Sequence, residues 1–237
     1  MTTLLLADLV IQIKHKYGYI RKHGKDYIYE GDRPVDIYIE ITQEDIENER
    51  KMADGNFFDN YLEYICAYRK IANEIIKFDA FVMHGTVISV EDRGIIFTAL
   101  SGTGKTTHML YWQELLGDKL TVINGDKPII RFFDGVPYAF GTPWAGKESF
   151  HTNARVELKD ICLIERADIN EVVPLTGFQV VSVFVKQIYK PSNPDLINKT
   201  FDLANNLLSN CNLRKIRCIK DISAAKTAYS AIFNKQI

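Results

Sequence analysis

Hydrophobic and polar residues alternate along much of the first 40 positions. Apolar side chains occupy every second position at Leu9, Ile11 and Ile13, and the tyrosines and β-branched residues of 17–40 continue this period. A period of two places alternate side chains on one face of a strand. Turn sequences at Gly24–Asp26 and Gly31–Pro34 separate the runs. The pattern therefore predicts short antiparallel strands over 9–13 and within 17–40.

The period then changes to the three-and-four spacing of a helix. Thr42 followed by Asp45 is typical of a helix start, which predicts a helix over 43–52. A longer apolar stripe predicts a second helix over 57–78, with its apolar face in the core. Residues 1–78 are thus predicted to form a small N-terminal α+β lobe.

From residue 79 onward, strand-like and helical patterns mix. Residues 129–133 and 136–140 predict a hairpin around Asp134-Gly135. The remaining predicted strands are 81–90, 94–99, 120–123, 156–165 and 213–219, and the remaining predicted helices are 105–116, 176–189, 195–209 and 221–233. This order predicts an α/β domain with a mixed sheet over residues 79–237.

A glycine-rich loop at residues 99–107 carries the most specific signal in the chain. The run has the spacing of a P-loop, with Ala99 in place of the usual first glycine, and it stands between a predicted strand and a predicted helix. Such a loop aims backbone N–H groups at a phosphate, Lys105 adds a cation, and the Thr106 hydroxyl is suited to Mg²⁺. The predicted phosphate-binding residues are Ser101, Gly102, Thr103, Gly104, Lys105, Thr106 and Thr107.

A second acidic element follows about 20 residues later, where an apolar strand ends at Asp126. A carboxylate at this position could bind Mg²⁺, or it could accept a proton from a substrate hydroxyl. The alternative interpretation is that residues 124–127 form a plain turn. Given the phosphate loop, we favour a metal and catalytic role for Asp126.

Composition excludes several classes of function. The formal net charge is −1, so no global basic field predicts binding to nucleic acid or to an anionic membrane. No stretch of about 18 apolar residues predicts a membrane span, and no signal peptide precedes Asp8. The four cysteines lack CxxC spacing and are expected to be buried thiols. We expect a cytoplasmic protein.

Four segments together resemble the superfamily of the HPr kinase/phosphorylase C-terminal domain and phosphoenolpyruvate carboxykinase. They are Met83–Val87, which contains a His-Gly pair, the loop Leu100–Thr107, Gly125–Pro128, and Gly141–Glu148, which is similar to a loop in HPr kinase-related proteins of unassigned substrate. The resemblance covers about residues 80–166 well, and it implies a mixed-sheet P-loop fold that binds ATP and Mg²⁺ and transfers a phosphoryl group.

The resemblance also implies roles for individual residues. His84 would lie near the γ-phosphate, and Asp126 would stand where the second of two family aspartates lies. The first family aspartate falls on Gly125, so Asp126 would do both jobs, or Glu148 or His84 would supply the base. The chain lacks the Pro-Gly-Arg-Asn run of true HPr kinases and is too short for a carboxykinase.

The loop after residue 140 contributes further candidates. Lys147 and Arg155, and with less support His151, could offset charge on a transferred phosphate. Trp144 could stack on a ligand or pack in the core.

These residues predict a Mg²⁺-dependent kinase that transfers the γ-phosphoryl group of ATP to a hydroxyl. The acceptor would be a serine of a peptide or small protein, or a small metabolite. Two alternatives stay open: a nucleotide-binding regulator or assembly protein without transfer, and a phosphohydrolase or phosphorylase acting in reverse. The sequence also leaves a homo-oligomer open.

Overall fold

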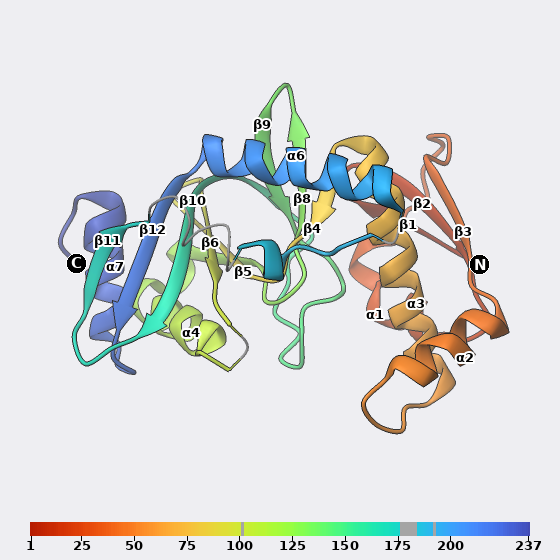
Figure 1. Ribbon diagram of the computed structural model, residues 1–237, viewed down its shortest axis with the longest axis horizontal. Helices are drawn as coiled ribbons and strands as arrows, with labels where there is room; N and C mark the ends of the chain where they lie inside the picture. Colours follow the sequence, from red (N-terminus) through yellow and green to blue (C-terminus); the bar gives the residue numbers. More distant parts are fainter. Residues whose placement is uncertain (101, 176–183, 192) are drawn as a thin grey trace.

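The computed structural model describes residues 1–100, 102–175, 184–191 and 193–237. Figure 1 shows a small sheet with α1, α2 and α3 at one end of the molecule, and α4 and α7 at the other end. The small sheet contains β1 (Thr2–Leu6), β2 (Leu9–Lys14) and β3 (Ile37–Glu40). The β1 and β2 strands form an antiparallel hairpin, and β3 pairs parallel to β2.

The prediction of short strands within 17–40 was wrong for most of that segment. That segment contains the short helix α1 (Tyr19–His23) and the 3₁₀ turn η1 (Lys25–Tyr27), and only β3 is a strand. The physical reason lies in the tyrosines. Tyr27 is buried and contacts His151, and Tyr19 packs on Tyr64. These rings therefore pack against distant parts of the chain and do not line one face of a strand.

The two predicted helices of the N-terminal part are confirmed. The α2 helix (Gln43–Met52) begins at a capping box, in which the Thr42 hydroxyl accepts from the Asp45 amide and the Asp45 carboxylate accepts from the Thr42 amide. The α3 helix (Asp59–Glu74) continues into the 3₁₀ turn η2 (Ile75–Phe78) and buries its apolar stripe.

The larger sheet is mixed, as predicted. In the described chain its strand order is β4-β8-β9-β10-β6-β5-β7, with β12 paired to β10 and β11 paired to β12. The β6, β10 and β12 strands are mutually parallel, and the other pairings are antiparallel. The strands are β4 (Ala80–Val82), β5 (Thr86–Val90), β6 (Arg93–Thr98), β7 (Leu120–Asn124), β8 (Ile129–Phe133), β9 (Val136–Phe140), β10 (Arg155–Arg166), β11 (Glu171–Pro174) and β12 (Asn212–Cys218).

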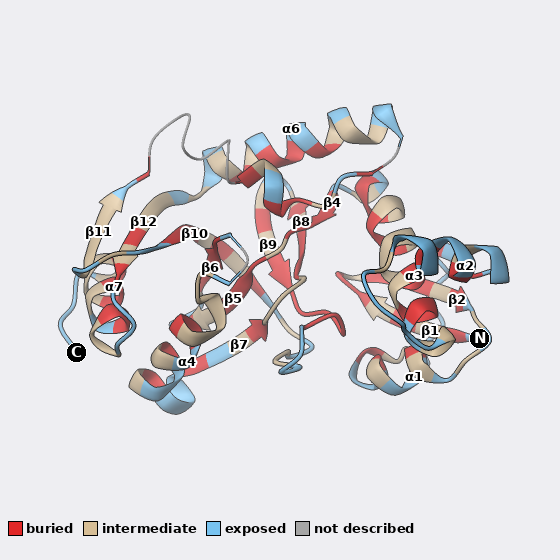
Figure 2. Cartoon of the chain, turned by 60° about the horizontal axis from the view of Figure 1, so that its bottom comes forward, coloured by how far each residue is buried: buried red, intermediate tan, exposed pale blue. Residues whose placement is uncertain are grey.

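Helices cover both faces of this sheet. The α4 helix (Lys105–Leu116) and α7 helix (Ser223–Phe233) share one buried cluster with β5, β6 and β12. The α6 helix (Pro194–Asn210) packs Leu203 and Leu207 against the opposite face. Figure 2 shows buried residues along both sheets and exposed residues on the outer sides of α2 and α6. The prediction of a helix over 176–189 falls partly outside the described residues, and residues 184–187 are helical.

A single hydrophobic cluster joins the small sheet to the larger one. It includes Leu6 and Ile13 from the small sheet, Ile71 from α3, and Val82 and Phe140 from the large sheet. The division into residues 1–78 and 79–237 therefore stays a prediction, with a shared core across the boundary. Among the described helices, none is long and apolar enough to cross a membrane.

Asp160 ties three strands together from a fully buried position. Its carboxylate accepts from Arg93 Nε at 2.5 Å and from Arg214 Nε at 3.0 Å. Asp160→Ala leaves two arginines without their acceptor, so the free energy of unfolding should fall by about 3 kcal/mol, at the low end for a broken buried pair because both arginines are partly exposed. Urea unfolding measures this free energy. The control is the neighbouring Lys159→Ala, which removes a partly exposed ion pair to Glu157 and should lower the free energy of unfolding by less than about 1 kcal/mol. Equal losses in the two variants would contradict this assignment.

Candidate active site

The glycine-rich loop leaves the sheet at the end of β6 and leads directly into α4. Gly102 has φ +76° and Gly104 has φ +120°, and a Cβ on either would have no heavy atom within 4 Å. These positions therefore require glycine for the backbone conformation and not for space. Lys105 is the first residue of α4, and its Nζ donates to the Ala99 carbonyl at 3.3 Å across the loop. Ser101 lies outside the described residues.

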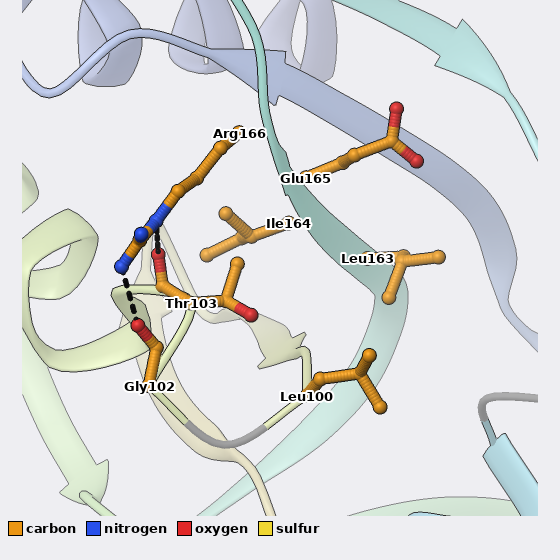
Figure 3. A pocket seen from close by; sticks show the side chains of 7 residues that line it. All are labelled: Leu100, Gly102, Thr103, Leu163, Ile164, Glu165 and Arg166. Carbon is orange, nitrogen blue, oxygen red and sulfur yellow. Dashed lines mark hydrogen bonds between the residues drawn. The ribbon is translucent and has the colours of Figure 1, made fainter.

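Arg166 holds the loop from the neighbouring strand, and the sequence patterns did not predict this role. Its Nε donates to the Thr103 carbonyl at 3.1 Å and its Nη2 donates to the Gly102 carbonyl at 2.5 Å (Figure 3). Arg166 ends β10, which runs parallel to β6, so both strands finish at the same edge of the sheet. A cation at the end of a parallel neighbouring strand is the sequence signal that could have identified it.

Arg166→Ala should loosen the loop and weaken nucleotide binding. Two charge-assisted hydrogen bonds are lost, but the guanidinium is exposed, so we expect a loss on the order of 1 kcal/mol, or several-fold in Kd for ATP. Calorimetric titration measures this, and Arg166→Lys should restore only part of the affinity because an ammonium lacks the two-pronged geometry. Unchanged affinity in Arg166→Ala would show that the loop needs no support from β10.

A buried asparagine shapes the turn that carries Asp126. Asn124 Oδ1 accepts from the amides of Asp126 at 2.9 Å and Lys127 at 2.7 Å. Asn124 Nδ2 donates to the carbonyl and the hydroxyl of Thr142, both at 3.0 Å. The Gly85 amide donates to the Asp126 carbonyl at 3.0 Å. Hydrogen bonds that involve Asn124, Thr142 and Gly85 therefore fix the backbone of the turn that carries Asp126.

Three charged or ionisable side chains meet at this turn. The Nε2 atom of His84 lies 3.1 Å from Asp126 Oδ1, and the Nζ atom of Lys127 lies 3.5 Å from the same oxygen. Burial by itself raises the pKa of Asp126, but the hydrogen bond from His84 and the charge of Lys127 outweigh burial and hold the pKa below its ordinary value. Asp126 is therefore ionised at neutral pH.

The phosphate loop begins beside the turn that carries Asp126, because the Thr98 hydroxyl at the end of β6 donates to the carbonyl of His84 at 3.4 Å. Burial lowers the pKa of the Lys105 ammonium, while the Asp126 carboxylate partly offsets this and Lys127 adds to the lowering. The loop and the acid turn, which are about 20 positions apart in sequence, thus face the same site. The structure brings together Lys105, Asp126 and His84 from the predicted set.

Gly125 lies close against the 145–150 loop. A Cβ at this position would stand 3.0 Å from the Ala145 carbonyl oxygen and 3.3 Å from the Phe150 carbonyl oxygen. A second carboxylate could not enter here without moving the 145–150 loop. Asp126 therefore lacks an adjacent acidic neighbour in the chain.

Glu148 approaches Asp126 from the facing loop. A Cβ built on Gly146 would lie 3.3 Å from Asp126 Cβ and 3.9 Å from Glu148 Oε2, which places both acids beside the same point. Glu148 is exposed and Asp126 is half-buried. Glu148 is thus available as a second acid. The sequence analysis named it as an alternative base.

The other predicted residues lie elsewhere. Arg155 stands at the start of β10, whereas the loop contacts the end of β10 through Arg166, and its guanidinium pairs with Asp8 at 2.6 Å and packs on Phe133. The prediction that Arg155 lies in the site is therefore not supported by its position, because the strand carries it to the opposite edge of the sheet. The backbone of His151 forms a β-bridge with Asn124 beside the turn of Asp126, but its side chain contacts the Tyr27 hydroxyl at 3.1 Å.

One cavity lies beside the phosphate loop, and a second lies beside the turn that carries Asp126. One, of about 580 Å³, lies beside the loop and is lined by Gly104, Thr107, Tyr111 and Arg166 among others. The other, of about 600 Å³, lies between α3 and the 143–149 loop and contains Asp126 and Lys147 on its wall. Trp144 is buried against Tyr64, as its interpretation as a core residue predicted, and it also lines this second cavity.

The donor set suits a hard cation. The Thr106 hydroxyl and the Asp126 carboxylate are oxygen ligands of the type that Mg²⁺ prefers, and Mg²⁺ commonly takes one or two protein ligands with phosphates and waters. Among the described residues, no group of three or more His, Cys, Asp or Glu side chains could hold a metal alone. A bound metal would therefore depend on phosphate oxygens for the rest of its shell.

The chain shows little similarity to known proteins. No family model matches the sequence, and no curated protein matches it significantly. Among solved structures, the chain is similar to the Hpr(Ser) kinase/phosphatase from Coxiella burnetii, with a TM-score of 0.37 and 9% identity, covering 65% of this chain and 94% of that chain. A likeness of this degree carries no argument about activity, so any function of this chain has to be inferred from its own residues.

Proposed function

We propose that this protein transfers the γ-phosphoryl group of ATP to a hydroxyl group in a Mg²⁺-dependent reaction. The observation that carries the proposal is that the glycine-rich loop leaves β6 beside the turn of Asp126: the Thr98 hydroxyl, at the end of β6, donates to the His84 carbonyl at 3.4 Å, and His84 Nε2 lies 3.1 Å from Asp126 Oδ1. A cation on such a loop with an ionised acid nearby suits the charge that develops in phosphoryl transfer.

The loop would bind the phosphates through backbone N–H groups. Gly102 and Gly104 supply the positive-φ backbone that such a loop needs, and the N-terminus of α4 adds partial positive charge. Lys105 would neutralise charge on the β- and γ-phosphates. The cavity beside the loop, lined by Tyr111 and Ile164, offers an apolar wall for the nucleoside.

Thr106 and Asp126 would hold Mg²⁺ together with the phosphates. When bound, the cation would neutralise charge that develops on the phosphate oxygens. Asp126 would also orient the acceptor hydroxyl and take its proton, with His84 and Lys127 fixing the carboxylate. Glu148 is the alternative base, and Lys147 on the facing loop would offset charge on the transferred group.

A second function, nucleotide binding without transfer, is favoured by one observation. A glycine stands at position 125, close against the 145–150 loop, so a single carboxylate at Asp126 would have to serve both metal and acceptor. Such a protein would bind ATP tightly and leave it intact.

Incubation with γ-³²P-labelled ATP, Mg²⁺ and a pool of hydroxylated metabolites and seryl peptides separates these functions. A kinase moves label to an acceptor and produces ADP in equal amount. Retention of intact ATP across the whole pool would support the binding protein instead. Release of phosphate from a phosphoseryl peptide would identify the reverse activity.

A further inference from the structure

The cavity on the far side of Asp126 has an unusual wall. It lies between α1 and α3 on one side and the 143–149 loop on the other, and it holds about 600 Å³. This volume is in the range of small-molecule sites. Asp126 lies on its wall, and His84, whose carbonyl accepts from Thr98 just before the phosphate loop, contacts the same carboxylate at 3.1 Å. The cavity therefore adjoins the turn that lies next to the proposed phosphate loop.

Aromatic rings held in fixed positions form much of this wall. Tyr64 and Trp144 stack with ring centroids 5.4 Å apart at 28°. The Tyr64 hydroxyl donates to the Pro143 carbonyl at 2.6 Å, and Trp144 Nε1 donates to the Tyr64 carbonyl at 3.2 Å. Because these polar groups are already satisfied by the protein, the two rings are held in fixed positions, and each residue keeps only 7% of its surface exposed to a ligand.

Three further tyrosines extend the aromatic surface toward solvent. Tyr19 meets Tyr64 edge-on at 5.6 Å, and Tyr68 lies 5.7 Å from Trp144. Tyr61 is 36% exposed at the rim. Aromatic faces and edges arranged in this way favour a flat ring as occupant.

Cations outnumber acids on the same wall. Lys147 lines the cavity, as do Lys127, which lies 3.5 Å from Asp126, and Arg69, whose guanidinium is already paired with Glu49 at 2.7 Å. Asp126 is the one acid among the described lining residues. His23 Nε2 is buried beside the rings and has no hydrogen-bond partner among the described residues, so it can bond to a polar group of a ligand. The wall therefore favours an anionic group on the occupant.

We propose that this cavity binds the phosphoryl acceptor, a small molecule with a planar ring, an anionic group and a hydroxyl. The assignment rests on the proposed function and names its substrate class. The ring packs among Tyr61, Tyr64 and Trp144, the anion faces Lys147, and the hydroxyl points to Asp126. The hydroxyl oxygen forms a bond to the γ-phosphorus, the bond from that phosphorus to the β–γ bridging oxygen breaks, the proton passes to Asp126, and ADP leaves.

Binding of probe compounds without nucleotide tests the cavity separately from the reaction. The probes are 4-(hydroxymethyl)benzoate, its saturated analogue 4-(hydroxymethyl)cyclohexanecarboxylate, and the neutral 4-methylbenzyl alcohol, followed by saturation-transfer NMR with the full chain. We expect the planar anion to bind at least several-fold more tightly than either analogue. Because no ATP is present, failure of phosphoryl transfer would leave this result standing.

Variants at the exposed rim keep the test independent of folding. Tyr61→Leu removes one ring and Lys147→Gln removes one charge, and each should weaken binding of the planar anion several-fold. The matched controls are Phe58→Leu and Lys51→Gln, at exposed positions outside the cavity. The proposal is overturned if the planar anion does not bind, if both analogues bind equally well, if the rim variants match their controls, or if a seryl peptide without aromatic or acidic residues binds better.

Discussion

Replacing Lys105 with alanine should lower the rate of phosphoryl transfer by on the order of 10³-fold and weaken ATP binding at least about tenfold. The ammonium is half-buried at the start of α4 and spans the loop to the Ala99 carbonyl. Its removal deletes the one cation that the loop itself carries, and backbone amides remain as the only phosphate ligands there. Both binding and transfer should therefore fail together.

The measurements for Lys105→Ala are a radiolabel transfer assay and a calorimetric titration with Mg²⁺-ATP. The matched control is Lys119→Ala, which removes an exposed lysine just after α4 and should leave both values unchanged. If Lys105→Ala kept the native transfer rate, the loop would not be the phosphate site.

Asp126→Asn should reduce phosphoryl transfer while it leaves ATP binding largely intact. Asparagine has the same shape, so the turn held by Asn124 and Gly85 should survive, but the charge and the proton acceptor are lost. Transfer should fall by about 10²–10⁴-fold, the usual contribution of a general base, with further loss from weaker Mg²⁺ binding. ATP affinity in the absence of Mg²⁺ should change little, or improve slightly as repulsion with the phosphates disappears.

The rival base supplies the control for Asp126. Glu148→Gln removes the other acid beside Gly146 and should reduce transfer only a few-fold if Asp126 is the base. The reverse result, a large loss in Glu148→Gln with near-native transfer in Asp126→Asn, would move the catalytic role to the facing loop.

Local signals explain why many elements were predicted well. The capping box at Thr42 and Asp45, the proline that opens α6 and the Asp134-Gly135 turn each act within a few residues. Interactions of this range are visible in the sequence. The glycines of the phosphate loop belong to the same group, because their positive φ is a local requirement.

The features that the sequence patterns did not predict depend on tertiary packing. The tyrosines of 17–40 mimic a strand pattern, yet they pack on α3 and on His151, which are distant in sequence. Arg166 reaches the loop only because β10 and β6 are parallel neighbours. Arg155 closely follows the loop of residues 141–150 in sequence, but it is the first residue of the long strand β10, and its side chain pairs with Asp8. The aromatic cavity combines segments near residues 19, 64 and 144, so no local pattern could indicate it.

The claim on which the proposed function depends is that residues 99–107 bind a polyphosphate. Isothermal titration of the full chain with Mg²⁺-ATP tests it most directly, with GTP and pyrophosphate titrated in parallel. We predict one-to-one association with Mg²⁺-ATP and weaker association in Lys105→Ala. Absence of any heat of binding with all three compounds, or equal binding by Lys105→Ala, would contradict the claim.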